Sequence, residues 1–147
     1  MSASAVVQEF FARYARSRTT LEVETVGAQY AEAFMFAGPN GVRVADKAGV
    51  LASLPKGLAF LESLGHRSTT VVSLDETSLD PHYILARVQF RWRFEKNGQP
   101  PVDVEAHATF ILHVGDGGPT IVFQQERDDF PDLLRAAGLL PPKPEAS

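Results

Sequence analysis

The residues best suited to chemistry lie in one short acidic segment near the end of the sequence. Glu126 and Asp128 are two positions apart, so they share a face if this segment is a β-strand. A carboxylate in an apolar cavity has a raised pKa and can serve as a general base. In the alternative interpretation the segment is a solvated strand end, with Asp129 capping a following helix.

The direction in which these acids point depends on the loop before them. If the alternation of the preceding strand continues, one set of residues faces the helices: Val122, Gln124, Glu126 and Asp128. Ile121 and Phe123 then face outward. A one-residue shift in the glycine-rich loop at 115–118 exchanges the two sets, and the sequence leaves both alternatives open.

Two earlier segments alternate apolar and polar residues as half-buried strands do: 83–95 and 102–114. Pairing them across an Asn-Gly turn places Arg93 opposite Asp103, and Arg91 opposite Glu105. We therefore interpret the polar face as a ladder of charges. The alternative is that its arginines form an anion site.

The rest of the pattern predicts helices around these strands. One amphipathic helix has a stripe at helical spacing, made of Val7, Phe10, Phe11 and Tyr14. Arg13, Arg16 and Arg18 are expected mainly off that stripe, near the helix C-terminus. A second helix is predicted to start at Thr19 by its capping-box spacing to Glu22. A third starts at Asp46, with a kink or a division into two shorter helices at Pro55, and a last short helix starts near Pro131.

Helices followed by a run of strands predict an α+β fold, with a curved antiparallel sheet and helices on one face. We expect one domain over residues 1–140 and an exposed tail over 141–147.

The order of elements resembles the nuclear transport factor 2-like superfamily, in particular its SnoaL-like members. The local matches are residues 5–10, 30–39 and 121–130, and the resemblance covers about residues 4–130. It implies a cone-shaped, curved antiparallel sheet with three N-terminal helices packed on its concave face. It also implies a cavity between sheet and helices, and a homodimer formed through the outer face of the sheet.

The superfamily includes ketosteroid isomerase, polyketide cyclases and epoxide hydrolases. At the positions that resemble the isomerase's catalytic groups, this sequence has Phe10, Gly38 and either Ala106 or Ala108, none of which ionises. We therefore expect no isomerase chemistry.

The hydrolase's last-strand motif is partly matched by residues 127–130, which would make Asp128 the inward carboxylate. Its partner segment, near residues 87–91, has no acid, so the hydrolase's catalytic set is incomplete. The resemblance to the cyclases leaves a lone base, either Glu126 or Asp128.

The composition excludes several classes of function. The chain has 147 residues, no cysteine, and 14 Lys and Arg against 18 Asp and Glu. Disulfides, thiolate metal sites and cysteine nucleophiles are therefore excluded. We expect no nucleic-acid partner, because there is no basic run, and no membrane span, because no apolar stretch is long enough. The histidines lack metal-ligand spacing and the glycines lack phosphate-binding motifs, so we expect no metal and no cofactor. The first residues lack a signal-peptide pattern, which predicts a cytoplasmic protein.

The hypothesis that follows is a protein that binds a small, largely apolar molecule in its cavity. The expected pocket residues are Tyr14, Phe34, Phe36, Phe60, Trp92, Phe110 and Gln124. Two alternatives remain. One is an enzyme of cyclase, isomerase or hydrolase type with a lone carboxylate base. The other is a homodimeric adaptor that binds proteins through its outer sheet face.

Overall fold

A computed structural model describes residues 4–143 of the chain. Its elements in chain order are α1 (Ala5–Arg16), α2 (Val23–Gln29), β1 (Tyr30–Gly38), β2 (Gly41–Asp46), α3 (Lys47–Ser63), β3 (His66–Asp80), β4 (Tyr83–Phe94), β5 (Val102–Gly115), β6 (Gly118–Glu126) and α4 (Phe130–Ala136). Of the predicted tail, residues 141–143 are exposed and residues 144–147 lie outside the described residues.

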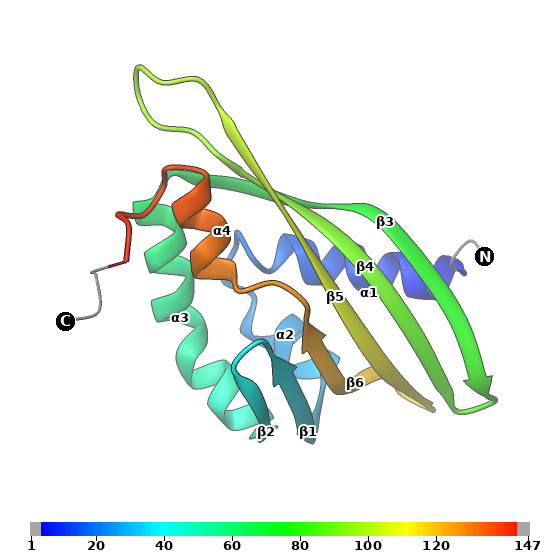
Figure 1. Cartoon of the computed structure of the whole chain (residues 1–147). Coiled ribbons are helices and arrows are strands. Elements are labelled where there is room, and N and C mark those ends of the chain that lie inside the picture. Colours follow the sequence, from blue (N-terminus) through cyan, green and yellow to red (C-terminus); the bar gives the residue numbers. More distant parts are fainter. Residues whose placement is uncertain (1–3, 144–147) are drawn as a thin grey trace.

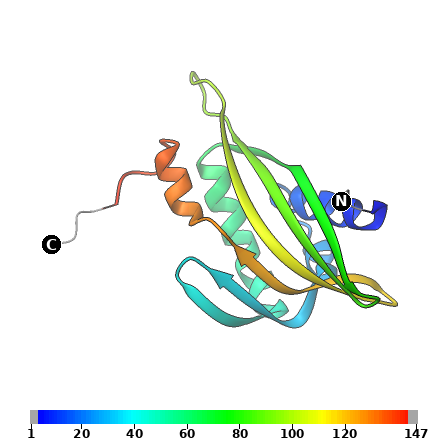
Figure 2. The same ribbon diagram turned by 45° about the vertical axis from the view of Figure 1, so that its right-hand side comes forward.

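The strands form one curved sheet in the order β2-β1-β6-β5-β4-β3. The long strands β3, β4 and β5 run side by side, and α1, α2 and α3 lie on one side of the sheet (Figures 1 and 2). The predicted α+β fold is therefore confirmed, and α4 confirms the short helix predicted near Pro131. The sheet departs from the predicted antiparallel arrangement at one pair, because β1 and β6 are parallel.

The first helix buries the predicted stripe, namely Val7, Phe10, Phe11, Tyr14 and also Ala15. The prediction of a helix start at Thr19 is wrong, since α2 begins at Val23. The Glu22 side chain is not available to cap Thr19, because its carboxylate accepts hydrogen bonds from Arg16 Nε (3.0 Å) and Nη2 (3.1 Å).

Asp46 caps α3 as predicted, accepting from the backbone N–H of Gly49 at 2.8 Å. The structure has one helix from Lys47 to Ser63 with Pro55 inside it, so the alternative of two shorter helices is wrong. Within the described residues, no helix is both long enough and apolar enough to cross a membrane.

The predicted register of β4 against β5 is confirmed. Arg93 lies opposite Asp103 and Arg91 opposite Glu105, and each arginine donates hydrogen bonds to the facing carboxylate. The arginines thus form a ladder of ion pairs on the outer face. The opposite face of both strands is buried against the helices, with Ala86 and Phe110 fully excluded from solvent.

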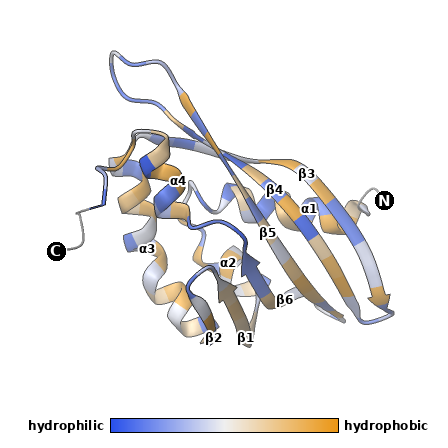
Figure 3. Cartoon of the chain, in the orientation of Figure 1, coloured by the Kyte–Doolittle hydropathy of each residue, from blue (hydrophilic) through white to orange (hydrophobic). Residues whose placement is uncertain are grey.

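A β-bulge divides β6 into two halves. Ile111 of β5 pairs with Phe123, whereas the next residue, Leu112, pairs with Ile121, so Val122 is an extra residue. Ile121 and Gln124 consequently both point inward and are both buried. Each half follows one of the two predicted alternations, and neither alternative describes the whole strand. In Figure 3 the end of β6 is hydrophilic and neighbouring β1 is hydrophobic.

Candidate functional site

A cavity of about 600 Å³ opens between the end of α1, the β1–β2 hairpin, the inner face of the sheet and the start of α4. Its apolar walls come from Phe36, Phe90, Trp92, Ala106 and Phe130. Its polar groups come from Tyr14, Arg18, Arg43, Gln124, Glu126, Asp128 and Asp129. A volume of this size accommodates a drug-sized ligand.

A second hollow, of about 720 Å³, lies between α1, α2 and the turn before β6. Its two arginines are exposed and form ion pairs at the surface, Arg13 with Glu9 and Arg16 with Glu22. We therefore place the candidate site in the first cavity.

Hydrogen bonds orient the polar groups on β6. The Tyr30 hydroxyl donates to Gln124 Oε1 at 2.9 Å, which sets the orientation of the Gln124 amide. Gln124 Nε2 then donates to Glu126 Oε1 at 2.7 Å and to the Tyr14 hydroxyl at 3.3 Å. The result is a chain of side chains that joins β1, β6 and α1 at the base of the cavity.

Burial changes the ionisation of two members of this chain. It raises the pKa of Glu126, while the Gln124 hydrogen bond and Arg18 act in the opposite direction and Asp128 adds to the rise. Burial also raises the pKa of Tyr14 well above its ordinary value, so its hydroxyl keeps its proton at neutral pH. The site thus contains a carboxyl group suited to exchange a proton beside a phenol that does not.

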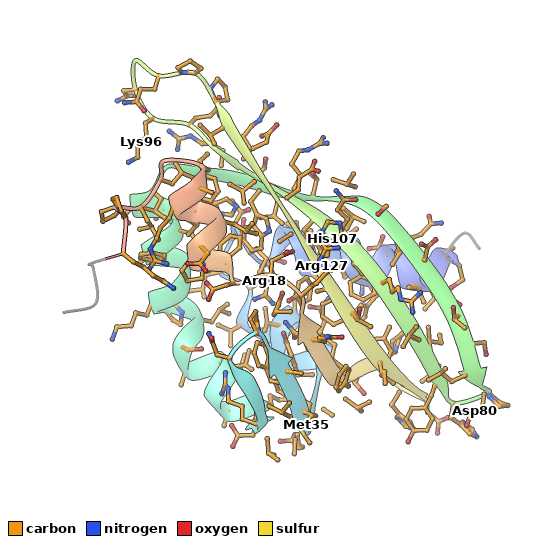
Figure 4. The ribbon with its side chains drawn as sticks, viewed as in Figure 1. Arg18, Met35, Asp80, Lys96, His107 and Arg127 are labelled. Atoms are coloured by element: carbon orange, nitrogen blue, oxygen red, sulfur yellow. The ribbon has the colours of Figure 1, made fainter. Side chains whose placement is uncertain are left out.

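Arg18 is the cation inside this cavity. Its guanidinium lies over the Tyr14 ring, 4.1 Å from the centroid. Burial opposes its charge, but the oxygens of Tyr14, Tyr30 and Glu126 raise the pKa of Arg18 above its ordinary value. Its Nε and Nη2 are buried and find no hydrogen-bond partner among the described residues. Figure 4 shows Arg18 in the interior, whereas His107 and Arg127 lie together along β5.

Trp92 supplies a second unpartnered donor. Its ring packs on Phe130, with centroids 4.8 Å apart, and on His66, with centroids 5.3 Å apart. The indole Nε1 is buried and has no hydrogen-bond partner within residues 4–143. Buried indole N–H groups ordinarily have a partner, so this donor is a feature of the cavity that needs an explanation.

Asp128 and Asp129 differ from Glu126, because both are held by backbone groups. Asp128 Oδ2 accepts from the backbone N–H of His107 at 2.9 Å, and its other oxygen lies 3.5 Å from Arg127 Nε. Asp129 caps α4 as the alternative interpretation predicted, accepting from the Asp132 N–H at 3.1 Å. The acids of this segment therefore have different roles. Glu126 lines the cavity, whereas Asp129 caps the N-terminus of α4.

The structure brings together four of the expected pocket residues, which are Tyr14, Phe36, Trp92 and Gln124. The other three do not line this cavity. Phe34 is buried against Tyr30, Phe110 is buried against Phe11, and Phe60 is 47% exposed on α3.

Sequence reasoning missed Arg18, and the expectation that it lies off the apolar stripe of α1 is wrong. The side chain lies over Tyr14, one helical turn earlier, so it continues the stripe beyond the end of the helix. The i, i+4 spacing from Tyr14 was the signal that could have found it. The residues at the isomerase-like positions that line the cavity are Gly38 and Ala106, which carry no ionisable group.

Comparison with solved structures identifies the class of fold. An NTF2-like protein with a cystatin-like fold from Novosphingobium aromaticivorans aligns with a TM-score of 0.71 and 16% identity, over 92% of this chain and 86% of that chain. An NTF2-like protein from Cytophaga hutchinsonii aligns with a TM-score of 0.64 and 12% identity, over 86% of this chain and 98% of that chain. An NTF2-like superfamily protein from Salmonella enterica aligns with a TM-score of 0.59 and 12% identity, over 82% and 86%.

The chain therefore has the nuclear transport factor 2-like fold, which confirms the resemblance at the level of the fold. No protein-family model and no curated protein matches the sequence. Because this fold carries many unrelated activities, the function has to be argued from the cavity.

Proposed function

We propose that the protein binds a small, largely apolar molecule in the cavity next to Arg18. The observation that carries the proposal is the composition of the cavity, which combines aromatic walls with a few convergent polar groups at its base. Phe36, Trp92 and Phe130 would hold the apolar body of the ligand, and the Tyr14–Gln124–Glu126 chain would orient its polar end. Three expectations from the sequence are part of the same proposal. They are that the protein is SnoaL-like, that it is located in the cytoplasm and that it forms a homodimer.

The test uses Trp92, which is the single tryptophan of the chain. N-phenyl-1-naphthylamine is an uncharged aromatic probe whose fluorescence rises in apolar sites. We expect saturable binding at one site per chain, with energy transfer from Trp92.

Ala106→Phe, which fills the cavity, should abolish this binding. Ala59→Phe, on the exposed surface of α3, is the matched control and should leave it unchanged. Absence of saturable binding, or equal binding by Ala106→Phe, would refute the proposal.

One observation favours a second candidate, an enzyme that uses Glu126 as a general base. Burial raises the pKa of Glu126, and its side chain lines the cavity. A base tuned toward neutral pH is more effective than an ordinary carboxylate. Asp128 is the weaker candidate, since one of its oxygens already accepts a backbone hydrogen bond.

A generic substrate tests this candidate without knowledge of the natural one. In 5-nitrobenzisoxazole, transfer of the C3 proton to a carboxylate leaves the C–H electron pair to form a nitrile. The ring N–O bond breaks, and its electrons go to the oxygen of a coloured phenolate. Removal of a positioned base costs about a hundredfold or more in rate, so Glu126→Gln should show that loss.

The wild-type rate should rise with pH as Glu126 loses its proton, with a midpoint above 4.5. A loss confined to Asp128→Asn would assign the base to Asp128 instead. If the wild type, Glu126→Gln and Asp128→Asn all react at the rate of free acetate, the protein is not an enzyme that uses either carboxylate as a base.

A further inference from the structure

We propose that the ligand carries a carboxylate, which binds to Arg18, while its apolar body packs against Phe36, Trp92 and Phe130. The inference rests on the proposed function and narrows it from small apolar molecules to small apolar monocarboxylates. It depends on the donors that the fold leaves unused inside the cavity.

The first step is the state of the Arg18 guanidinium. Its Nε and Nη2 are neighbouring donors on one edge of a planar group, and both are buried without a partner in the described part of the chain. This edge is the one that binds a carboxylate through two parallel hydrogen bonds. A buried donor left unsatisfied is costly, so a position of this kind needs a reason.

The second step is that Arg18 forms no close ion pair among the described residues, although Glu126 attracts it from a longer distance. Among the described residues, Arg18 has no carboxylate within ion-pair distance, although acids line the same cavity. One oxygen of each of two such acids already accepts another hydrogen bond. Glu126 Oε1 accepts from Gln124 at 2.7 Å, and Asp128 accepts from the His107 backbone at 2.9 Å. One edge of a buried cation, on a side chain that lines the cavity, is therefore left without a partner among the described residues.

The third step distinguishes a carboxylate from a phosphate. A phosphate monoester brings nearly two negative charges into a cavity that Glu126, Asp128 and Asp129 also line. Arg18 is the interior cation, because Arg43 is exposed and lies over the Phe36 ring, 5.0 Å from its centroid. With one interior cation and several acids in the lining, the cavity favours a ligand with a single negative charge over a dianion.

The fourth step concerns the remaining donor and the apolar body. Trp92 lines the same cavity, and its buried Nε1 is a further donor without a partner among the described residues. The ring packs against Phe130, so a ligand that reaches this N–H must also contact aromatic surface. An apolar ring with one carboxylate satisfies both requirements, whereas a small polar acid leaves the aromatic walls in water.

The experiment compares three probes with the same rigid apolar body: adamantane-1-carboxylate, adamantane-1-carboxamide and 1-adamantyl phosphate. None absorbs near 280 nm, so Trp92 fluorescence and calorimetry can both report binding at pH 7. Charge-assisted hydrogen bonds favour the carboxylate over the neutral amide by about tenfold or more in Kd. We expect this preference in the wild type.

Three variants show whether Arg18 causes the preference. Arg18→Met should bind the carboxylate and the amide equally, and Arg18→Lys should keep only part of the preference because it lacks the planar fork. Arg16→Met, at an exposed arginine at the end of α1, is the control and should bind as the wild type does. Circular dichroism of each variant establishes that it is folded.

The outcomes separate this inference from the proposed function. Equal binding of the carboxylate and the amide by the wild type would overturn the carboxylate inference and leave a general apolar-ligand site. Preference for the phosphate would overturn it as well. If none of these probes binds, and N-phenyl-1-naphthylamine does not bind either, both proposals fail.

Discussion

Replacing Arg18 by methionine is expected to stabilise the protein while removing its ligand preference. Methionine keeps the unbranched apolar stem and removes two buried donors that lack partners. Each such donor costs roughly 1–3 kcal/mol in the folded state. Loss of the contact between the guanidinium and the Tyr14 ring destabilises the variant by about 1–2 kcal/mol. The two donors together cost about 2–6 kcal/mol, so the net expectation is an increase of between about 0 and 5 kcal/mol in the free energy of unfolding.

Urea and thermal unfolding, followed by circular dichroism at neutral pH without ligand, measure this change. For a chain of this size, each kcal/mol corresponds to about 2–4 °C in Tm. Arg16→Met is the matched control, because Arg16 is exposed and paired with Glu22, and it is expected to give no increase. A decrease of more than about 1 kcal/mol for Arg18→Met would refute the reasoning, since unsatisfied donors cannot stabilise the fold.

Glu126→Gln should be more stable than the wild type at pH 7, because burial raises the pKa of this carboxyl and the folded state resists its ionisation. The advantage should amount to about 1.4 kcal/mol for each unit of difference between the folded and unfolded pKa, and it should vanish as pH falls below 4.5. An advantage that grows on acidification would contradict this. Phe110→Ala should lower the free energy of unfolding by about 3–5 kcal/mol, whereas Phe60→Ala, on the surface, should change it by less than about 0.5 kcal/mol. Equal losses in urea unfolding would show that Phe60 also packs in the core. Light scattering should give a homodimer mass that substitutions on the outer sheet face reduce to a monomer mass; a monomer mass for the wild type would exclude the dimer.

Local periodicity predicted much of the fold. The apolar stripe of α1 and the alternation in β4 and β5 both follow from side-chain geometry within a single element. The pairing of Arg93 with Asp103 followed because a short turn leaves few registers that match charges. Asp129 was also recognisable as a cap, since capping is decided within one helical turn.

The site was harder to predict because it depends on contacts between distant elements. The bulge at Val122 arises from the pairing of β6 with its neighbours, and a single-strand alternation cannot contain it. Phe110 and Phe60 both looked like pocket residues, but packing buries one in the core and leaves the other in solvent. Arg18 was missed because its head group is charged and because it lies beyond the end of α1, where its side chain continues the apolar face of that helix.

The bulge in β6 also has an evolutionary consequence. On one side of Val122, the strand contributes Ile121 to the core, where a change in side-chain volume disturbs closely packed neighbours. On the other side, Glu126 lines a cavity, where the same change meets open space. The extra residue Val122 therefore separates a half of β6 that packs in the core from a half that lines the cavity. A lineage with this chain can exchange Glu126 for another residue, and so change the ligand, with less disturbance of the core than a change at Ile121 would cause.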